Sequence, residues 1–167
     1  MTALELDAVI ADLQRAFPPG LLAPAGAFDA WGTTYLSVDD FERRSRGETW
    51  RSLSAAFLEF HHDALFMLDS AAFAAYLPAY LRAVLLERDQ LDALPGFLIG
   101  ALSRRIDDEA LRVRFDRRVS ALDRAQRAAV AQALEFLASH TDDSQPALRR
   151  RWHAALDSYW STPARET

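Results

Sequence analysis

The densest group of ionisable side chains lies in one short stretch, Glu59-Phe60-His61-His62-Asp63. Glu59 and His62 are three residues apart, which is the spacing that places two metal ligands on one face of a helix in di-iron carboxylate sites. Such a site needs a second pair of this kind, and no other histidine has Glu three residues before it. Glu59, His62 and Asp63 are therefore the metal-ligand candidates of an alternative function. The favoured interpretation is a polar helix end, with His62 hydrogen-bonded locally and with His61 and Asp63 in solvent.

The chain has one basic run, Arg149-Arg150-Arg151. Three neighbouring guanidinium groups can neutralise phosphates, so Arg149, Arg150 and Arg151 are candidate binding residues. The helix that they occupy is expected to begin beside Asp142 and Asp143, which weakens its positive field. A solvated helix face is therefore the more common explanation, and nucleic-acid binding is only a second alternative.

Two tyrosines, Tyr76 and Tyr80, lie four residues apart on either side of Pro78. That spacing places both phenol rings on one helix face. Because buried tyrosine hydroxyls need hydrogen-bond partners, Tyr76 and Tyr80 could line a binding pocket, and they are candidate binding residues. More often such a pair anchors a core helix.

Several familiar chemistries are excluded by composition and motif. The chain has no cysteine, so disulfides, thiolate zinc sites and cysteine nucleophiles are absent. All 19 basic residues are arginine, so no P-loop lysine is present. No glycine-rich dinucleotide loop, serine nucleophile elbow or H-E-x-x-H motif occurs either. We therefore expect no cofactor and no catalytic residue, and we consider an enzyme less favoured than a non-enzyme.

Hydrophobic spacing predicts about six or seven helices, and the chain is expected to be all-α. A capping box at Thr2 opens a helix that ends near Phe17, and Pro78 is expected to kink or split a central apolar helix. Ser120 is expected to begin a capping signal, and one short extended segment is possible near 33–38. The expected helices cover 2–17, 49–65, 71–86, 95–102, 107–118, 122–137 and 146–160.

The length of the chain and the distribution of its charges indicate the number of domains and the location of the protein. A chain of 167 residues with half its residues apolar can form one compact helical bundle, so we expect a single domain over 1–167 with a frayed tail at 161–167. The longest uncharged run is thirteen residues, too short to span a membrane, and the first residues lack a basic secretory signal. We therefore expect a cytoplasmic protein with no membrane partner.

Four segments resemble one family, and one of them is Ala64-Leu65-Phe66-Met67-Leu68. The most specific is Phe73-x-x-Tyr76-Leu77-Pro78-Ala79-Tyr80-Leu81, and Trp50-x-x-Leu53 and Gln126-Arg127-x-Ala129-Val130 accompany it. The chain resembles a family of small uncharacterised bacterial proteins, a domain of unknown function, over about 48–138. The resemblance implies a bacterial source and one small domain, and it transfers no functional residue.

The leading functional hypothesis is a non-catalytic protein-interaction module, such as an adaptor or an immunity-type protein that neutralises a toxin. The acidic side chains belong mainly to residues 1–100, which carry a net charge of −7, whereas residues 101–167 carry +2. An acidic surface attracts basic partners. The alternatives are the metal site and the weak nucleic-acid site described above, and the sequence does not indicate an oligomeric state.

Overall fold

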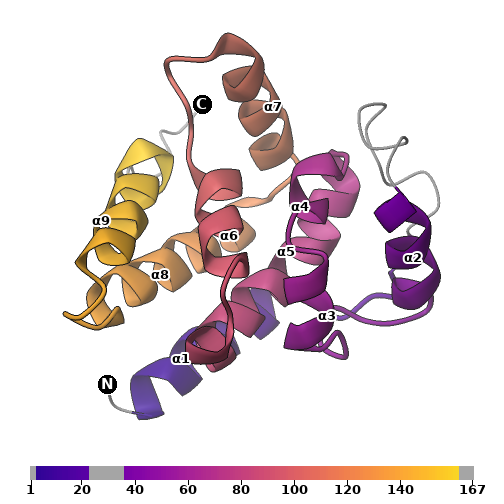
Figure 1. Ribbon diagram of the computed structural model, residues 1–167, viewed down its shortest axis with the longest axis horizontal. Coiled ribbons are helices and arrows are strands. Elements are labelled where there is room, and N and C mark those ends of the chain that lie inside the picture. Colours follow the sequence, from indigo (N-terminus) through magenta and orange to yellow (C-terminus); the bar gives the residue numbers. More distant parts are fainter. Residues whose placement is uncertain (1–2, 23–35, 162–167) are drawn as a thin grey trace. The chain divides into compact units, whose positions relative to one another are not determined.

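The computed structural model of the chain describes residues 3–22 and 36–161 (Figure 1). In these residues the protein is all-α, as expected, and contains no strand beyond one isolated bridge between Leu21 and Thr49. The α-helices are α1 (Ala3–Ala16), α2 (Leu36–Ser45), α3 (Ala55–Phe60), α4 (Ala64–Met67), α5 (Ser70–Glu87), α6 (Leu94–Leu102), α7 (Glu109–Ser120), α8 (Arg124–His140) and α9 (Pro146–Ala155). A 3-10 turn, η1 (Arg88–Gln90), follows α5, and a π-helical segment, η2 (Leu156–Trp160), continues α9.

The chain divides into two compact units. Unit 1 comprises Met1–Phe17 and Leu102–Thr167, and unit 2 comprises Pro18–Ala101. Unit 2 is therefore inserted in the sequence between the first helix of unit 1 and the rest of it. The expectation of a single domain stays a prediction.

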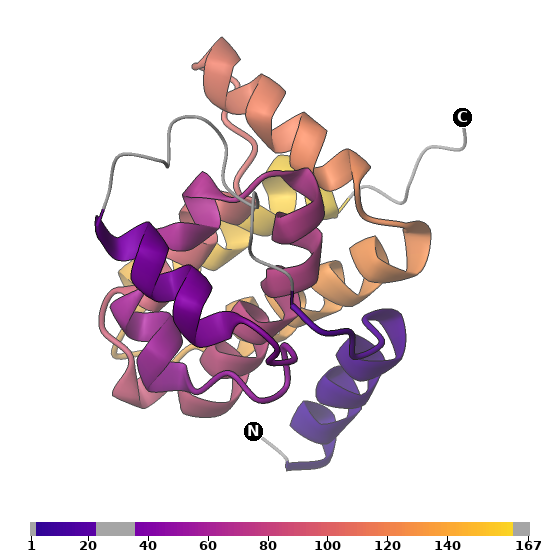
Figure 2. The same ribbon diagram turned by 90° about the vertical axis from the view of Figure 1, so that its right-hand side faces the viewer.

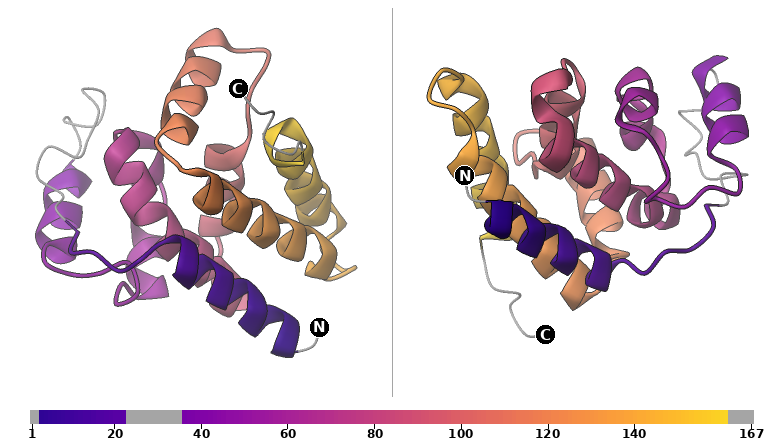
Figure 3. Two further views of the ribbon diagram at one scale, coloured as in Figure 1. Left: turned by 180° about the vertical axis from the view of Figure 1, so that it is seen from behind. Right: turned by 90° about the horizontal axis from the view of Figure 1, so that it is seen from below.

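Unit 1 is built on α8, which packs against α1, α9 and η2 (Figure 3). The helix begins at a capping box, in which Asp123 accepts from the backbone of Gln126 while the Gln126 side chain accepts from the backbone of Asp123. Its apolar stripe is buried, as its spacing predicts. The fully buried residues include Leu13, Val130, Ala133, Leu134 and Trp152.

Unit 2 is organised around α5, which is buried on most of its surface and contacts α3 and α4 (Figure 2). Asp69 caps its first turn by accepting a hydrogen bond from Ala72 N. Pro78 lies inside this helix, and α5 continues through it from Ser70 to Glu87. Of the two outcomes expected at Pro78, a kink or a split, the split is therefore wrong, because tertiary packing of the buried turns on both sides offsets the one hydrogen bond that proline cannot donate. The kink stays a prediction.

The prediction of an extended segment near 33–38 is wrong for its described part. Leu36–Ser45 form α2, so Leu36 to Val38 are its first turn, whereas 33–35 lie outside the described residues. Strand propensity depends on a neighbouring strand to pair with, and the described chain offers none here. Val38 and Phe41 instead share a buried helix face.

The prediction of one helix over 49–65 is also wrong. The helix begins only at Ala55, where Ser54 accepts from Phe57 N, and it ends at Phe60. Before it, Ser52 donates to the Glu48 carboxylate and accepts from Thr49 N. Such local side-chain hydrogen bonds compete with a helix, which explains the late start.

Other sequence expectations concern the connections and the ends of the chain. Thr2, the expected first cap, and 162–167, in the tail expected to fray, lie outside the described residues. Ser120 is not a cap, because Asp123 caps α8 and the Ser120 hydroxyl donates to Arg117 O at the end of α7. Among the helices of the described chain, none is both long and apolar enough to cross a membrane.

Candidate functional site

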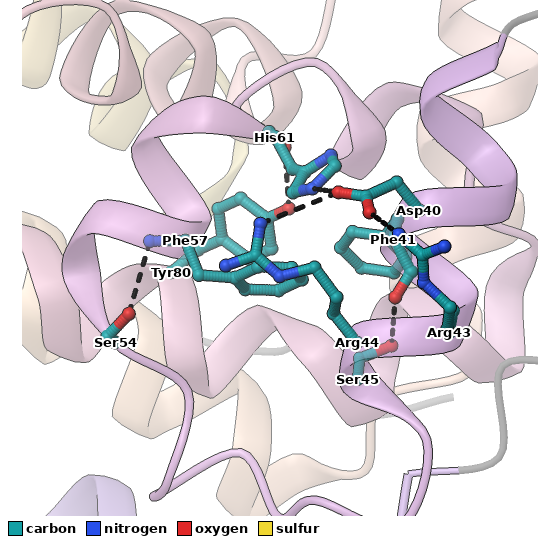
Figure 4. Close-up of polar contacts among 9 residues, drawn as sticks. All are labelled: Asp40, Phe41, Arg43, Arg44, Ser45, Ser54, Phe57, His61 and Tyr80. Atoms are coloured by element: carbon teal, nitrogen blue, oxygen red, sulfur yellow. Dashed lines mark hydrogen bonds and ion pairs between the residues drawn. The ribbon is translucent and has the colours of Figure 1, made fainter.

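A polar and aromatic cluster in unit 2 joins α2, the end of α3 and the middle of α5 (Figure 4). Asp40 projects from α2, His61 directly follows α3, and Tyr80 lies on α5. The turn between α3 and α4 directs the His61 ring inward, where Phe41 and Phe57 flank it at centroid distances of 5.4 and 4.7 Å. Residues far apart in the sequence therefore meet at one buried imidazole.

The His61 side chain is only 1% exposed, and its Nε2 lies 3.2 Å from Asp40 Oδ2. The prediction that His61 lies in solvent is therefore wrong, because the ring fills a gap between aromatic side chains. Desolvation lowers the pKa of His61 below its usual value, although the carboxylate of Asp40 opposes that shift. Neutral His61 then donates its Nε2–H to the carboxylate, which can only accept.

Asp40 is held by two arginines of its own helix. Arg43 forms a close ion pair with Asp40 Oδ1, and Arg44 Nη1 lies 3.5 Å from Oδ2. Burial raises the pKa of Asp40, but the hydrogen bonds and charges of the two arginines outweigh it, so the pKa is lowered overall. The Arg44 guanidinium also lies 5.0 Å from the centre of the Phe57 ring. Asp40 is therefore ionised at neutral pH.

Tyr76 and Tyr80 lie in the same cluster and are both buried. The Tyr80 hydroxyl donates to the His61 carbonyl at 2.9 Å. The Tyr76 hydroxyl lies 2.8 Å from Ser45 Oγ, and Tyr76 is the donor because the Ser45 hydroxyl donates to Phe41 O at 2.7 Å. Burial raises the pKa of both phenols, that of Tyr80 well above its usual value. Both hydroxyls therefore connect helices, and the prediction that the tyrosines bind a ligand stays untested.

Glu59, the first metal-ligand candidate, is used at the start of α6. Its two carboxylate oxygens accept from Ala93 N at 2.7 Å and Leu94 N at 3.0 Å. His62 Nδ1 lies 2.7 Å from Glu59 O, and the His62 ring packs on Phe97 at 4.2 Å. Over the described residues, no three side chains of the metal-binding types lie close enough to hold an ion. The Glu59 carboxylate therefore binds the start of α6, and His62 is bonded to the backbone carbonyl of Glu59 rather than to its carboxylate.

The arginine run lies on α9 in unit 1, where Arg150 and Arg151 are exposed. Arg149 forms an ion pair with Asp143, just before this helix. The acidic residues at the helix start therefore neutralise part of the run. Nucleic-acid binding by these arginines stays an untested hypothesis.

Sequence reasoning missed the contact between Asp40 and His61 and the capping role of Glu59. The two members of the first pair are 21 residues apart, and Glu59 is 34 residues before the first amide that it binds. One signal in the sequence was the clustering of acids and arginines in 39–46, because a buried histidine needs a carboxylate or another acceptor for its ring N–H. A histidine among phenylalanines at 57–61 was the second sign.

Comparison with known proteins gives one match. The model of a family described as "Family of unknown function (DUF6714)" matches residues 6–164. No curated protein and no solved structure matches the chain. The matched range includes the main segments of both units.

Proposed function

The chain belongs to the DUF6714 family of unknown function, and from that premise we propose that it is a non-catalytic protein-interaction module. A partner protein would dock on unit 2 around Phe60. The observation that carries this proposal is a large apolar side chain held in solvent beside the buried His61 cluster. Such a side chain has no role in the core, and phenylalanine, like the other aromatic residues, is enriched at the centres of protein interfaces.

Phe60 is 69% exposed although it is the last residue of α3. Its ring meets the His61 ring edge-on at a centroid distance of 4.9 Å. Because His61 is buried and bonded to Asp40, the Phe60 ring packs against a fixed neighbour. A pre-positioned aromatic ring loses little conformational entropy when a partner covers it, which favours binding.

The groups able to do chemistry near Phe60 have structural partners. Glu59 caps α6, His61 is buried against Asp40, and the hydroxyl of Tyr80 is bonded to a backbone carbonyl. A general acid or base must reach its substrate, and these groups point into unit 2. This arrangement supports binding over catalysis.

Charge supports a basic partner. Residues 18–101 contain eleven acidic residues and six arginines, which gives this segment a net charge of −5. A field of this sign speeds encounter with a positively charged surface and weakens as salt screens it. The association rate is therefore expected to fall as ionic strength rises.

Photo-crosslinking tests the docking position. A photoreactive phenylalanine analogue is placed at position 60 in the cells that produce the chain, and the same analogue replaces Ile106 in unit 1 as a control. Ile106 is 82% exposed, so the two probes have similar access to solvent. We expect one protein to be captured from position 60 and not from position 106.

The captured protein is then purified and its affinity is measured. Phe60→Ser should weaken binding by about 30-fold, as for an aromatic residue at the centre of an interface. Leu86→Ser, at a side chain of α5 that is 44% exposed, is the matched control and should change binding by less than about threefold. Equal capture from both probe positions, or no effect of Phe60→Ser, would refute the proposed surface.

A further inference from the structure

Three half-buried aromatic side chains of unit 2 form a patch in which Phe97 touches both of the others. Its ring lies 4.2 Å from the ring of His62, between centroids, and meets the ring of Phe66 edge-on at 5.9 Å. Gly100 leaves room for this arrangement, because a Cβ at that position would lie 2.9 Å from Phe66 Cζ. We call His62, Phe66 and Phe97 the aromatic patch. Since none of the three is fully buried, solvent or a partner can reach part of each ring.

His62 presents a hydrogen-bond acceptor at the aromatic patch. Its Nδ1 lies 2.7 Å from Glu59 O, and because a carbonyl oxygen can only accept, Nδ1 carries the proton of the neutral ring. Nε2 of His62 then has a free lone pair. Among the residues that the structure describes, Nε2 has no hydrogen-bond partner, and it is not a buried atom, so it is open to a donor from outside.

Two carboxylates lie beside the aromatic patch in the sequence. Asp63 directly follows His62, and Asp92 comes just before the helix-start amides that the Glu59 carboxylate binds. Asp63 is half-buried and Asp92 is exposed, and in the described part of the chain neither is paired with an arginine. Residues 18–101 also carry a net charge of −5. The charge around the patch therefore favours a cation.

An arginine side chain suits these groups better than a lysine side chain does. The guanidinium is planar, stacks on aromatic rings and carries five N–H donors. It can stack on the Phe97 ring and at the same time donate to His62 Nε2. The ammonium of lysine is more strongly hydrated and has no plane to stack.

Unit 2 already contains one arginine held in this way. The Arg44 guanidinium lies 5.0 Å from the centre of the Phe57 ring, and its Nη1 lies 3.5 Å from Asp40 Oδ2. Figure 4 shows this arginine beside a phenylalanine, a carboxylate and the ring of His61. The aromatic patch offers the same three kinds of group, but no arginine of the described chain stacks on its rings.

We propose that the partner of unit 2 places an arginine side chain on the aromatic patch, with the guanidinium stacked on Phe97 and donating to His62 Nε2. Asp63 and Asp92 supply the opposite charge. The inference rests on the proposed docking of a partner around Phe60, two residues before His62, and it names the side chain that the partner brings.

Two blocked tripeptides test the preference on the whole protein. One has a central arginine and the other a central lysine, each between glycines, so they carry the same charge and differ in the shape of the cation. NMR spectra of the Phe97 ring and of the His62 ring nitrogens, at about pH 8, follow the titrations. The arginine peptide should shift both sets of signals with a Kd of about 1–10 mM, and the lysine peptide should bind about three- to tenfold more weakly.

Variants separate the two contacts, and in each variant the ring that remains reports binding. Phe97→Leu keeps an apolar side chain but removes the ring, so it should weaken the arginine peptide by about two- to fivefold. His62→Phe keeps a ring but removes the acceptor, and it should weaken the peptide by about threefold. Tyr159→Leu, at a half-buried ring of unit 1, is the matched control and should change the Kd by less than about 1.5-fold.

The wild-type titrations decide the outcome if a variant does not fold. The inference is overturned if the two peptides bind equally, or if about 20 mM of the arginine peptide shifts neither ring. It is also overturned if folded Phe97→Leu and His62→Phe bind the arginine peptide as the wild-type protein does. Capture of a partner from position 60 together with equal peptide binding refutes only the arginine, whereas selective peptide binding without capture refutes only the docking proposal.

Discussion

Both carboxylate oxygens of Glu59 accept from consecutive backbone amides, those of Ala93 and Leu94. The first amides of a helix have no partner within it, so this side chain supplies from α3 what a local cap would supply from the preceding residue. A residue that spacing alone marks as a metal ligand thus joins two helices of unit 2.

We predict that Glu59→Ala lowers the free energy of unfolding by about 1–2 kcal/mol, because two helix-start amides lose their acceptors. Glu59→Gln should cost less, since its amide oxygen still accepts one bond. Urea unfolding followed by circular dichroism gives both values. Glu135→Ala, at an exposed position of α8, should change stability by less than about 0.5 kcal/mol. Equal effects of Glu59→Ala and Glu135→Ala would contradict the capping role.

Two arginine–aspartate pairs in unit 1 allow a reciprocal test of pKa. Hydrogen bonds from Arg104 lower the pKa of Asp116, and those from Arg105 lower the pKa of Asp107 to about 2. Arg104→Gln should raise the pKa of Asp116 towards 3.8 and leave that of Asp107 unchanged, and Arg105→Gln should do the reverse. Carboxyl ¹³C NMR titrations measure both.

The Arg104–Asp116 pair also affects the stability of the protein in acid. Because the folded-state pKa of Asp116 is lowered, its contribution is present above pH 3.8 and is lost as the pH falls through the folded-state pKa. Arg104→Gln should therefore flatten the stability curve of the protein below pH 3.8. An unchanged slope would show that the pair does not contribute to acid sensitivity.

At the scale of elements, the sequence and the structure place the N-terminal cap of α8 at different residues. The sequence places a cap at Ser120, whereas the structure places it at Asp123, which forms a capping box with Gln126. Asp123→Ala should cost about 1 kcal/mol and at most about 2 kcal/mol in thermal or urea unfolding. Ser120→Ala, which removes only an exposed bond to Arg117 O, should cost less than about 0.5 kcal/mol. A larger loss of stability for Ser120→Ala than for Asp123→Ala would mean that α8 begins earlier in solution.

The turn after α2 depends on a glycine. Gly47 has a φ of +78°, and a Cβ there would strain the backbone although no atom lies within 4 Å of it. Gly47→Ala should therefore lower the free energy of unfolding by about 1–2 kcal/mol. Gly20→Ala is the matched control, since Gly20 also has open space around it but no positive φ, and it should be neutral or slightly stabilising. Similar effects of the two variants on urea midpoints would contradict a strained position.

The sequence predicted the long helices well and the short ones poorly. The apolar spacing of α1, α5, α8 and α9 spans several turns, so periodicity identifies them, and Asp69 and Pro146 mark two of their starts. The segment at 49–65 carries similar spacing, but serine and threonine hydrogen bonds delay the helix to Ala55. Periodicity shows which side chains are buried, and it does not show where the backbone breaks.

The candidate site was predictable only in part. Tyr76 and Tyr80 stand out by spacing, and the structure places both hydroxyls in the cluster. The meeting of Asp40 with His61 depends on how α2 packs, and no local pattern encodes a contact across 21 residues. The burial of His61 is a tertiary property for the same reason.

At the scale of the whole molecule, the sequence indicates one domain and the contacts define two units. The single-domain prediction can be tested by unfolding, because one cooperative domain unfolds in one step. Amide signals of Leu81 in α5 and Leu134 in α8, both fully buried, should then disappear at the same urea concentration in wild-type NMR spectra. Separate midpoints would show that the units unfold independently.

The interrupted sequence of unit 1 affects the order in which the chain can fold during synthesis. The helix α1 packs against α8, which begins about 110 residues later in the chain. At a typical ribosomal rate of about 5–20 residues per second, α1 is made roughly 5–25 s before its partner exists. All of unit 2 is translated in that interval. The apolar face of α1 must therefore remain uncovered, or be shielded by a chaperone, until α8 leaves the ribosome.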